Sequence, residues 1–128
     1  MKLGYVIVYV ADVPATVAFY ERAFGLTCRF RHGTKYAEME TGATALAFAH
    51  ESFVASSGVG FAVNRAINVA PGAEVGLVTD DVADKFSAAI AAGAAAVLQP
   101  TLKPWGQTVA YVRDCNGFLV EICSPVAA

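Results

Sequence analysis

Two glutamates stand in segments whose other residues have the pattern of β-strands. Glu74 opens the alternating segment 74–79, and Glu121 lies inside segment 118–123, where its neighbours are all apolar. Two carboxylates that approach each other in a partly dry cavity repel one another, and such a pair can act as general acid and base or bind a cationic group. The alternative for Glu74 is that it marks the rim of a sheet and is simply solvated.

Aromatic side chains supply a second kind of chemistry. Trp105, the only tryptophan, lies in the loop 103–107 just before a strand. Its ring could stack on a planar ligand at the mouth of a cavity, or it could cover the end of the sheet. Tyr5, Tyr9 and Tyr111 lie in strand-like segments, so each is either a half-buried strand aromatic or a ligand contact.

The cysteines predict neither a disulfide framework nor a nucleophile. There are three of them, they form no CxxC pair, and no histidine lies near Cys115 in the sequence. We expect Cys28 and Cys123 to be small apolar core residues and Cys115 to be exposed at a turn. This usage is typical of a reduced, cytoplasmic protein.

The composition limits the partners that the chain can have. Its 128 residues fit one domain, 1–128, and 56% of them are hydrophobic, which excludes intrinsic disorder. Nine Lys+Arg against eleven Asp+Glu give a net charge of −2, so we expect no nucleic-acid partner. No apolar run reaches the ~20 residues that span a bilayer, and the first residues lack the pattern of a signal peptide. We therefore expect no membrane partner.

The strand-like segments belong to an internal repeat. Segment 5–10 alternates like a strand and precedes an amphipathic helix, with Asp12 placed to cap its N-terminus and Gly25 after its end. Segment 74–79 begins the same order 69 positions later, with Asp81 in the place of Asp12. Apolar residues at helical spacing predict the buried stripes of the two helices: Val13, Val17, Tyr20 and Phe24, then Val82, Phe86 and Ile90.

Each helix is followed by three short β-rich segments. They are 27–31, 35–40 and 44–49 in the first half and 96–99, 108–112 and 118–123 in the second. Before the last of them, Asn116-Gly117 predicts a type I′ hairpin turn, in which both central residues have positive φ. The sequence thus predicts two βαβββ modules, module one 1–50 and module two 74–128, joined by a connector 51–73 without a clear pattern.

A four-stranded sheet with a helix on one face leaves its other face bare, so two such modules must meet. They can meet within one chain or between two chains. The long connector permits domain swapping into a dimer, and we expect a homodimer.

Three stretches carry a resemblance to a known family. They are residues 5–25 (YVIVYVADVPATVAFYERAFG), 74–93 (EVGLVTDDVADKFSAAIAAG) and 105–125 (WGQTVAYVRDCNGFLVEICSP). With its paired βαβββ plan, the chain resembles the vicinal-oxygen-chelate superfamily, which includes glyoxalase I, bleomycin-resistance proteins and extradiol dioxygenases. The resemblance implies an α+β, glyoxalase-like fold whose curved mixed sheet encloses a cavity. It does not determine the activity.

Metal-dependent members of this superfamily hold a divalent ion with four His or Glu side chains. The resemblance places these ligands at Tyr5, Ala47, Glu74 and Glu121, of which only Glu121 matches outright. Strand alternation puts all four positions on the sheet faces that carry no helix. With Tyr and Ala at two of them, we expect no cofactor and no metal; if a divalent metal binds, Glu74 and Glu121 are its ligands.

We expect a small-molecule-binding protein that works without the usual metal, of the drug-sequestering kind. The alternative is a lyase or isomerase of the glyoxalase type, with an atypical metal site or with Glu74 and Glu121 as catalytic acid and base. A third hypothesis is an interaction module whose own side chains fill the cavity. The residues expected to contact a ligand are Tyr5, Tyr9, Ala47, Trp105 and Tyr111.

Overall fold

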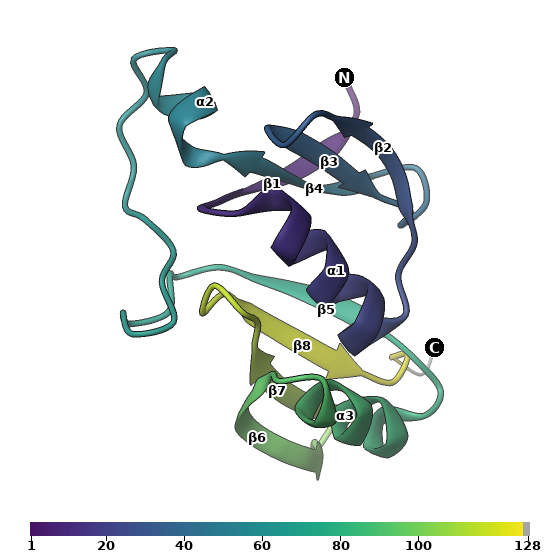
Figure 1. Ribbon diagram of the computed structural model, residues 1–128. Coiled ribbons are helices and arrows are strands. Elements are labelled where there is room, and N and C mark those ends of the chain that lie inside the picture. The colour runs from purple at the N-terminus through teal and green to yellow at the C-terminus, as the bar shows by residue number, and fades with distance from the viewer. Residues whose placement is uncertain (127–128) are drawn as a thin grey trace. The chain divides into compact units, whose positions relative to one another are not determined.

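The computed structural model describes residues 1–126 (Figure 1). The chain forms two compact units, Met1–Asn64 and Arg65–Ala128, called here the first and the second unit. Each unit contains a four-stranded sheet and one long helix. Within the described residues, no helix is long and apolar enough to cross a membrane. The organisation of residues 1–128 as a single domain stays a prediction.

The first unit follows the predicted βαβββ order. Its elements are β1 (Tyr5–Val10), α1 (Val13–Phe24), β2 (Cys28–His32), β3 (Tyr36–Met39), β4 (Ala45–His50) and the short helix α2 (Glu51–Ala55). The strands lie in the order β1-β4-β3-β2, with β1 parallel to β4 and the other neighbours antiparallel.

Helix α1 starts and ends where the sequence predicts. The Asp12 carboxylate accepts a hydrogen bond from the backbone N–H of Ala15 at 3.0 Å, and Pro14 occupies the first turn, where its missing N–H costs nothing. At the other end, Gly25 has a φ of 68°, and its N–H bonds to the carbonyl of Glu21. The predicted cap and stop of this helix are confirmed.

One face of the first sheet packs against α1. Val10 on β1 and Phe48 on β4 are fully buried, and the ring of Tyr20 on α1 lies 4.8 Å from that of Phe48. Phe24, predicted in the same buried stripe, is only half-buried. The opposite face of this sheet does not pack against α1, and Tyr5 on it is 55% exposed.

The second unit repeats this plan. Its elements are β5 (Glu74–Val78), α3 (Val82–Ala91), β6 (Ala95–Leu102), β7 (Thr108–Arg113) and β8 (Leu119–Cys123), with strand order β5-β8-β7-β6. The Asp81 carboxylate caps α3 as predicted, accepting from the N–H of Asp84 at 3.3 Å. The helix buries Val82 and Phe86, whereas Ile90 at the edge of the stripe is 36% exposed.

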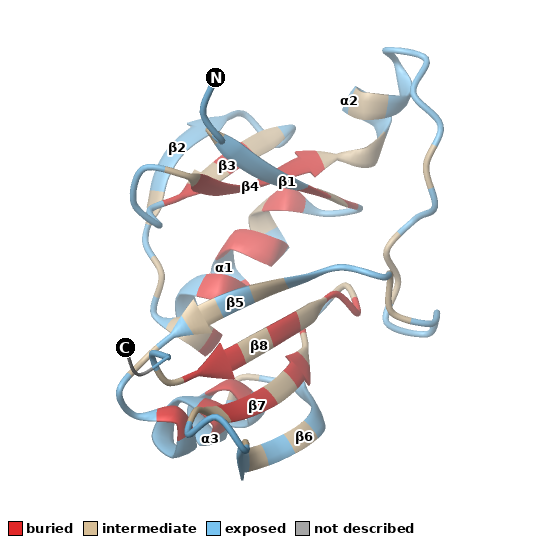
Figure 2. Ribbon diagram, turned by 180° about the vertical axis from the view of Figure 1, so that it is seen from behind, coloured by how far each residue is buried: buried red, intermediate tan, exposed pale blue. Residues whose placement is uncertain are grey.

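The inner strands are more buried than the edge strands, although the edge strand β1 buries Val8 and Val10. Figure 2 shows buried residues along β4, β7 and β8, while β2, β5 and β6 are mostly exposed or intermediate. Strand β6 is an edge strand and runs to Leu102, beyond the predicted end at residue 99. It passes through Pro100, which an edge strand tolerates because one side of its backbone needs no partner.

The connector begins with a helix that the sequence pattern does not predict. The backbone N–H of Ser52 donates to Nδ1 of His50 at 3.1 Å, so an imidazole caps α2. Helix starts are recognised by Ser, Thr, Asp or Asn at the cap, and a histidine in this role gives no such signal.

The predicted type I′ turn at Asn116-Gly117 is wrong. No residue other than glycine has positive φ among residues 1–126, and of this pair only Gly117 has it, at 82°. The Asp114 carboxylate accepts hydrogen bonds from the N–H groups of Asn116 and Phe118 at 2.8 and 2.9 Å. An aspartate that bonds to its own turn replaces the backbone geometry that Asn-Gly alone suggests.

Arg113 links this turn by hydrogen bonds to residues 66–68, which precede β5. Its guanidinium donates to the carbonyls of Gly117 at 2.8 Å, Ala66 at 3.3 Å and Asn68 at 2.6 Å. Gly117 faces the same segment so closely that an added Cβ would lie 2.6 Å from the carbonyl oxygen of Arg65 and would also contact the Arg113 guanidinium. Only glycine fits this position.

We predict that Gly117→Ala destabilises the protein by about 3 kcal/mol, because the positive φ costs about 1–2 kcal/mol and the close contact adds to it. The matched control is Gly106→Ala, since Gly106 has a φ of 90° but an added Cβ meets nothing within 4 Å. That variant should lose only about 1 kcal/mol. Denaturant unfolding of both variants measures the difference, and equal losses would contradict the close contact.

Candidate functional site

Three side chains from three neighbouring strands meet on the helix-free face of the second sheet. Glu74 is the first residue of β5, Glu121 lies in the middle of β8, and Tyr111 lies on β7. Tyr111 pairs with Glu121 across the β7–β8 ladder, and Gly76 pairs with Glu121 across β5–β8. Because side chains alternate along a strand, Glu74 shares the face of Gly76 and therefore of Glu121.

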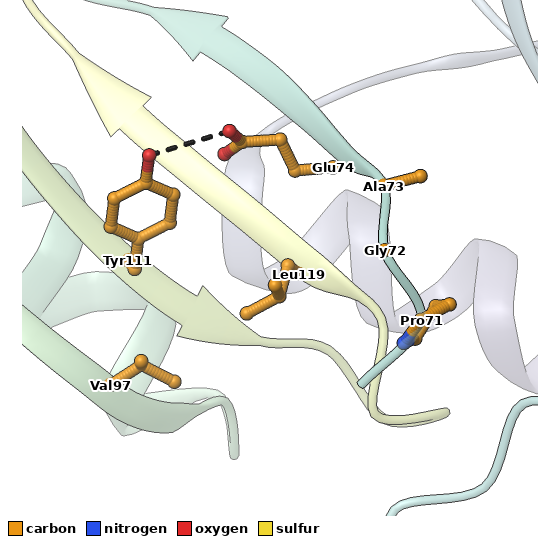
Figure 3. A pocket seen from close by; sticks show the side chains of 7 residues that line it. All are labelled: Pro71, Gly72, Ala73, Glu74, Val97, Tyr111 and Leu119. Carbon is orange, nitrogen blue, oxygen red and sulfur yellow. Dashed lines mark hydrogen bonds between the residues drawn. The ribbon is translucent and has the colours of Figure 1, made fainter. Parts of the chain in front are cut away.

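The Tyr111 hydroxyl lies between the two carboxylates. Its oxygen is 3.3 Å from Oε1 of Glu74 and 3.2 Å from Oε1 of Glu121. Figure 3 shows the contact with Glu74 as a dashed line. A phenol carries a single proton, so it can donate a full hydrogen bond to only one of the two acceptors at a time. Both distances exceed the usual 2.7–2.8 Å, as expected when one proton is shared.

The phenol keeps its proton over the whole neutral range. Burial first, and then the negative charges of Glu121 and Glu74, together raise the pKa of Tyr111 to about 12. Tyr111 is therefore a hydrogen-bond donor to this pair and not a phenolate.

The two carboxylates have no basic partner within the second unit. Among residues 65–126 of the second unit, no Lys, Arg or His nitrogen lies within 4.0 Å of Glu74 or Glu121. Gly76 leaves space beside Oε2 of Glu121, because a Cβ at this position would lie 3.2 Å from that oxygen. The site combines a partly buried negative charge with open room around it.

A hollow adjoins Glu74 and Tyr111 of this trio. Its volume is about 480 Å³, and its walls are mostly apolar (Figure 3). The residues that line it are Pro71, Gly72, Ala73, Glu74, Val97, Tyr111 and Leu119. Volume and lining are in the range of small-molecule sites, which are typically apolar with a few polar groups.

The helix-free face of the first sheet has a different chemistry. Tyr5 and Ala47 lie on this face, and Ala47 is fully buried and offers no atom that could bind a ligand through a polar contact. Opposite Ala47, across the β3–β4 ladder, stands Glu38. Its carboxylate accepts hydrogen bonds from Nε of Arg29 at 3.1 Å and from the Tyr36 hydroxyl at 2.9 Å. The chain itself neutralises this carboxylate.

Sequence reasoning misses the cluster of Arg29, Tyr36 and Glu38. Strand alternation places Tyr36 and Glu38 on one face and could have identified them, since Ala37 and Met39 between and after them are buried. Arg29 gives no such signal, because it lies in a β-bulge: Cys28 pairs with Met39 while Phe30 pairs with Glu38. Burial, followed by the hydrogen bond and charge of Glu38, raises the pKa of Tyr36 to about 12.

The remaining predicted ligand contacts lie outside the trio. The Tyr9 ring packs edge-on against Phe61, with centroids 4.9 Å apart. Trp105 is 58% exposed, its indole N–H donates to Gln107 at 2.8 Å, and it does not line the hollow. Of the seven predicted site residues, the structure brings together Glu74, Tyr111 and Glu121. The functional roles assigned to all seven stay predictions.

The thiols offer no nucleophile at this site. Cys123 follows Glu121 on the same face of β8, and burial, helped by the charge of Glu121, raises its pKa. A thiol with a raised pKa is protonated and unreactive at neutral pH. Cys28, Cys115 and Cys123 form no disulfide; Cys115 is exposed and Cys123 buried as predicted, whereas Cys28, predicted in the core, is only half-buried.

A divalent metal does not fit these residues. Among residues 1–126, no group of three or more His, Cys, Asp or Glu side chains is placed to hold an ion. The second unit contributes two carboxylates, and Ala47 contributes none. A stable site usually needs three or four protein ligands in fixed geometry.

Comparisons with known proteins agree with this architecture. A family model described as the Glyoxalase/Bleomycin resistance protein/Dioxygenase superfamily matches residues 2–122. A glyoxalase-related enzyme from Fulvimarina pelagi superposes with a TM-score of 0.83 at 19% identity, covering 98% of this chain and 88% of the other. A family enzyme from Burkholderia phytofirmans PsJN gives a TM-score of 0.80 at 20% identity, covering 99% and 100%.

A third solved structure, TioX from Micromonospora sp. ML1, is 26% identical with a TM-score of 0.72, covering 97% of this chain and 98% of that one. No curated protein sequence matches the chain. The predicted α+β, glyoxalase-like fold and the predicted family resemblance are confirmed by the family match and by these superpositions.

We predict that Tyr111 and Tyr36 lose their protons near pH 12, well above the ordinary value of 10 for a tyrosine. Glu121→Gln should lower the pKa of Tyr111, because it removes a negative charge beside the phenol, and should leave Tyr36 unchanged. NMR titration of ring-labelled tyrosines measures both values. A Tyr111 that titrates at pH 10 in the unaltered protein would contradict the geometry of the trio.

The raised pKa values of Tyr36 and Tyr111 also determine how the stability of the folded protein changes at alkaline pH. Because the folded state binds these two phenolic protons more tightly than the unfolded state, their contribution to stability is complete below pH 10. It is lost as the pH rises from 10 towards 12.

Proposed function

Because the chain belongs to the glyoxalase/bleomycin resistance protein/dioxygenase superfamily, we propose that it binds a small organic molecule on the helix-free face of its second unit. The ligand occupies the hollow beside Glu74, Tyr111 and Glu121. The protein works without a divalent metal and holds its ligand as a drug-sequestering protein does.

One observation carries this proposal: an apolar hollow of about 480 Å³ is lined by Glu74 and Tyr111, and the Tyr111 hydroxyl connects Glu74 to the second carboxylate, Glu121. Pro71, Val97 and Leu119 can bury the apolar part of a ligand, while the trio orients its polar part. The relatives named glyoxalase-related or bleomycin-resistance proteins support a small molecule as the ligand.

The absence of a metal is part of the proposal and rests on the donor set. Ala47 replaces a carboxylate with a methyl group and is fully buried, so no water-filled space surrounds it. Two glutamates and a phenol are a poorer set than the family's four ligands. Elemental analysis of the purified protein should find less than one divalent ion per chain.

We also propose a homodimer in the cytoplasm. Apolar side chains on the edge strands β1 and β5, among them Ile7 and Val78, are exposed and could be covered by a second copy. Three cysteines that form no disulfide suit a reducing compartment. Light scattering on the purified protein determines the number of chains.

We predict that Val97→Trp, which fills the hollow, weakens ligand binding about tenfold or more, because overpacked sites exclude a ligand body of the same volume. The matched control is Ile90→Trp, on α3 in a separate hollow between α3 and β6. Backbone amide NMR during titration with a library of small aromatic compounds gives both affinities. Binding that survives Val97→Trp unchanged, or that also falls in Ile90→Trp, would contradict this location.

A second candidate function is a lyase or isomerase in which Glu74 and Glu121 transfer protons. The contact of one Tyr111 hydroxyl with both carboxylates favours it, because a proton can pass between the two through the phenol oxygen. If the protein is such an enzyme, Glu121→Gln abolishes turnover and Glu21→Gln on α1 leaves it unchanged. Substantial turnover in Glu121→Gln would dismiss the proton-transfer role.

A further inference from the structure

Building on the proposed function, we propose that the ligand is an organic cation: a protonated amine, amidine or guanidine whose charged group lies between Glu74 and Glu121 while its apolar body fills the hollow. The inference names the chemical class of the ligand. It rests on charge, on hydrogen-bond capacity and on a comparison between the two units of the chain.

The charge of the site is uncompensated. Within residues 65–126 of the second unit, Glu74 and Glu121 lie within reach of one hydroxyl and of no basic side chain. Arg113 is the basic residue on the same face of β7, two positions from Tyr111, but its guanidinium already donates to three carbonyls. It is therefore engaged and does not neutralise the pair.

The hydrogen-bond capacity of the trio is also unfilled. The two carboxylates offer four oxygens, whereas the single phenolic proton serves at most one or two of them. Besides the phenol, the only hydrogen-bond partner of Glu121 within the described part of the second unit is the Cys123 thiol, a weak donor, and Gly76 keeps space open beside Oε2 of Glu121. An ammonium group brings three N–H donors, and a guanidinium brings five, so either can satisfy these acceptors at once.

The first unit contains the same kind of tyrosine–glutamate pair, but there an arginine compensates the charge of the glutamate. There the tyrosine hydroxyl of Tyr36 donates to Glu38, and the guanidinium of Arg29 lies 3.1 Å from the same carboxylate. Glu38 and Tyr111 occupy corresponding places in the two ladders, opposite Ala47 and Glu121 respectively. At the corresponding place the second unit has a tyrosine–glutamate pair and an additional glutamate, and no arginine of this unit's described residues lies beside them. A ligand cation would supply there what Arg29 supplies in the first unit.

The hollow distinguishes an organic cation from a metal ion. Val97, Leu119 and Pro71 bring apolar surface to the trio, which a hydrated ion cannot use and a hydrocarbon body can. No third His, Cys, Asp or Glu in residues 1–126 completes a metal site.

The test uses three probes with the same ring and different charge: naphthylmethylamine, naphthylmethanol and naphthoate. Titration of the full chain, followed by backbone amide NMR, should show the amine binding about tenfold or more tightly than the alcohol, with shifts at Val97, Tyr111 and Leu119. Naphthoate should not bind. Glu74→Gln and Glu121→Gln should each weaken the amine about tenfold and leave the alcohol unchanged, whereas Glu21→Gln, a charge-matched control on α1, should alter neither.

The outcomes separate this inference from the proposed function. If the alcohol or naphthoate binds in the hollow as tightly as the amine, the cationic class is wrong while a small-molecule site remains. If none of the three probes binds, the cationic class is overturned, and the site itself is decided by the Val97→Trp comparison. If zinc or magnesium ions alone bind with one ion per chain and shift Glu74 and Glu121, a metal takes the place of the organic cation. Thermal unfolding confirms that each variant is folded, and Glu74→Gln at the exposed start of β5 provides the second test should Glu121→Gln unfold.

Discussion

Side chains in a β-strand alternate between the two faces of a sheet, and in each unit of this protein a single helix covers one of those faces. The covered face takes the valines, Phe48 and the other apolar residues that form the core. The charged residues of the inner strands, such as Glu38 and Glu121, lie on the opposite face. This alternation brings Glu74, Tyr111 and Glu121 together from three strands, although 47 positions separate the two glutamates in the chain.

The two units then use their uncovered faces differently. In the first, Glu38 is paired with Arg29 and accepts a hydrogen bond from Tyr36, so its charge is compensated within the sheet. In the second, the two carboxylates share one phenol and retain their net charge. Keeping such charges partly buried without a partner costs stability, and proteins tend to accept that cost where the groups serve a ligand or a reaction.

Much of this fold can be predicted from local sequence patterns. Asp12, Gly25 and Asp81 mark the helix ends by their types, and strand alternation is sufficient to place Glu74 and Glu121 on one face. Other features depend on contacts that no local pattern reveals. The histidine cap of α2, the carboxylate of Asp114 that builds the β7–β8 turn, and the bulge that aims Arg29 at Glu38 each arise from a side chain that takes an unusual partner. To predict them, one would have to know which residues lie next to these side chains in three dimensions.

The hydrogen bonds from Arg113 to the carbonyls of Ala66 and Asn68 affect more than the stability of one turn, because they also position the residues beside the hollow. The wall of the hollow begins at Pro71, only three residues after the last carbonyl that this guanidinium holds. The position of Pro71 in that wall therefore depends on Arg113, although Arg113 itself does not line the cavity. A natural variant at Arg113 could change which molecules the cavity admits, and a survey of sequence changes that looked only at contacting residues would assign the effect to the wrong place.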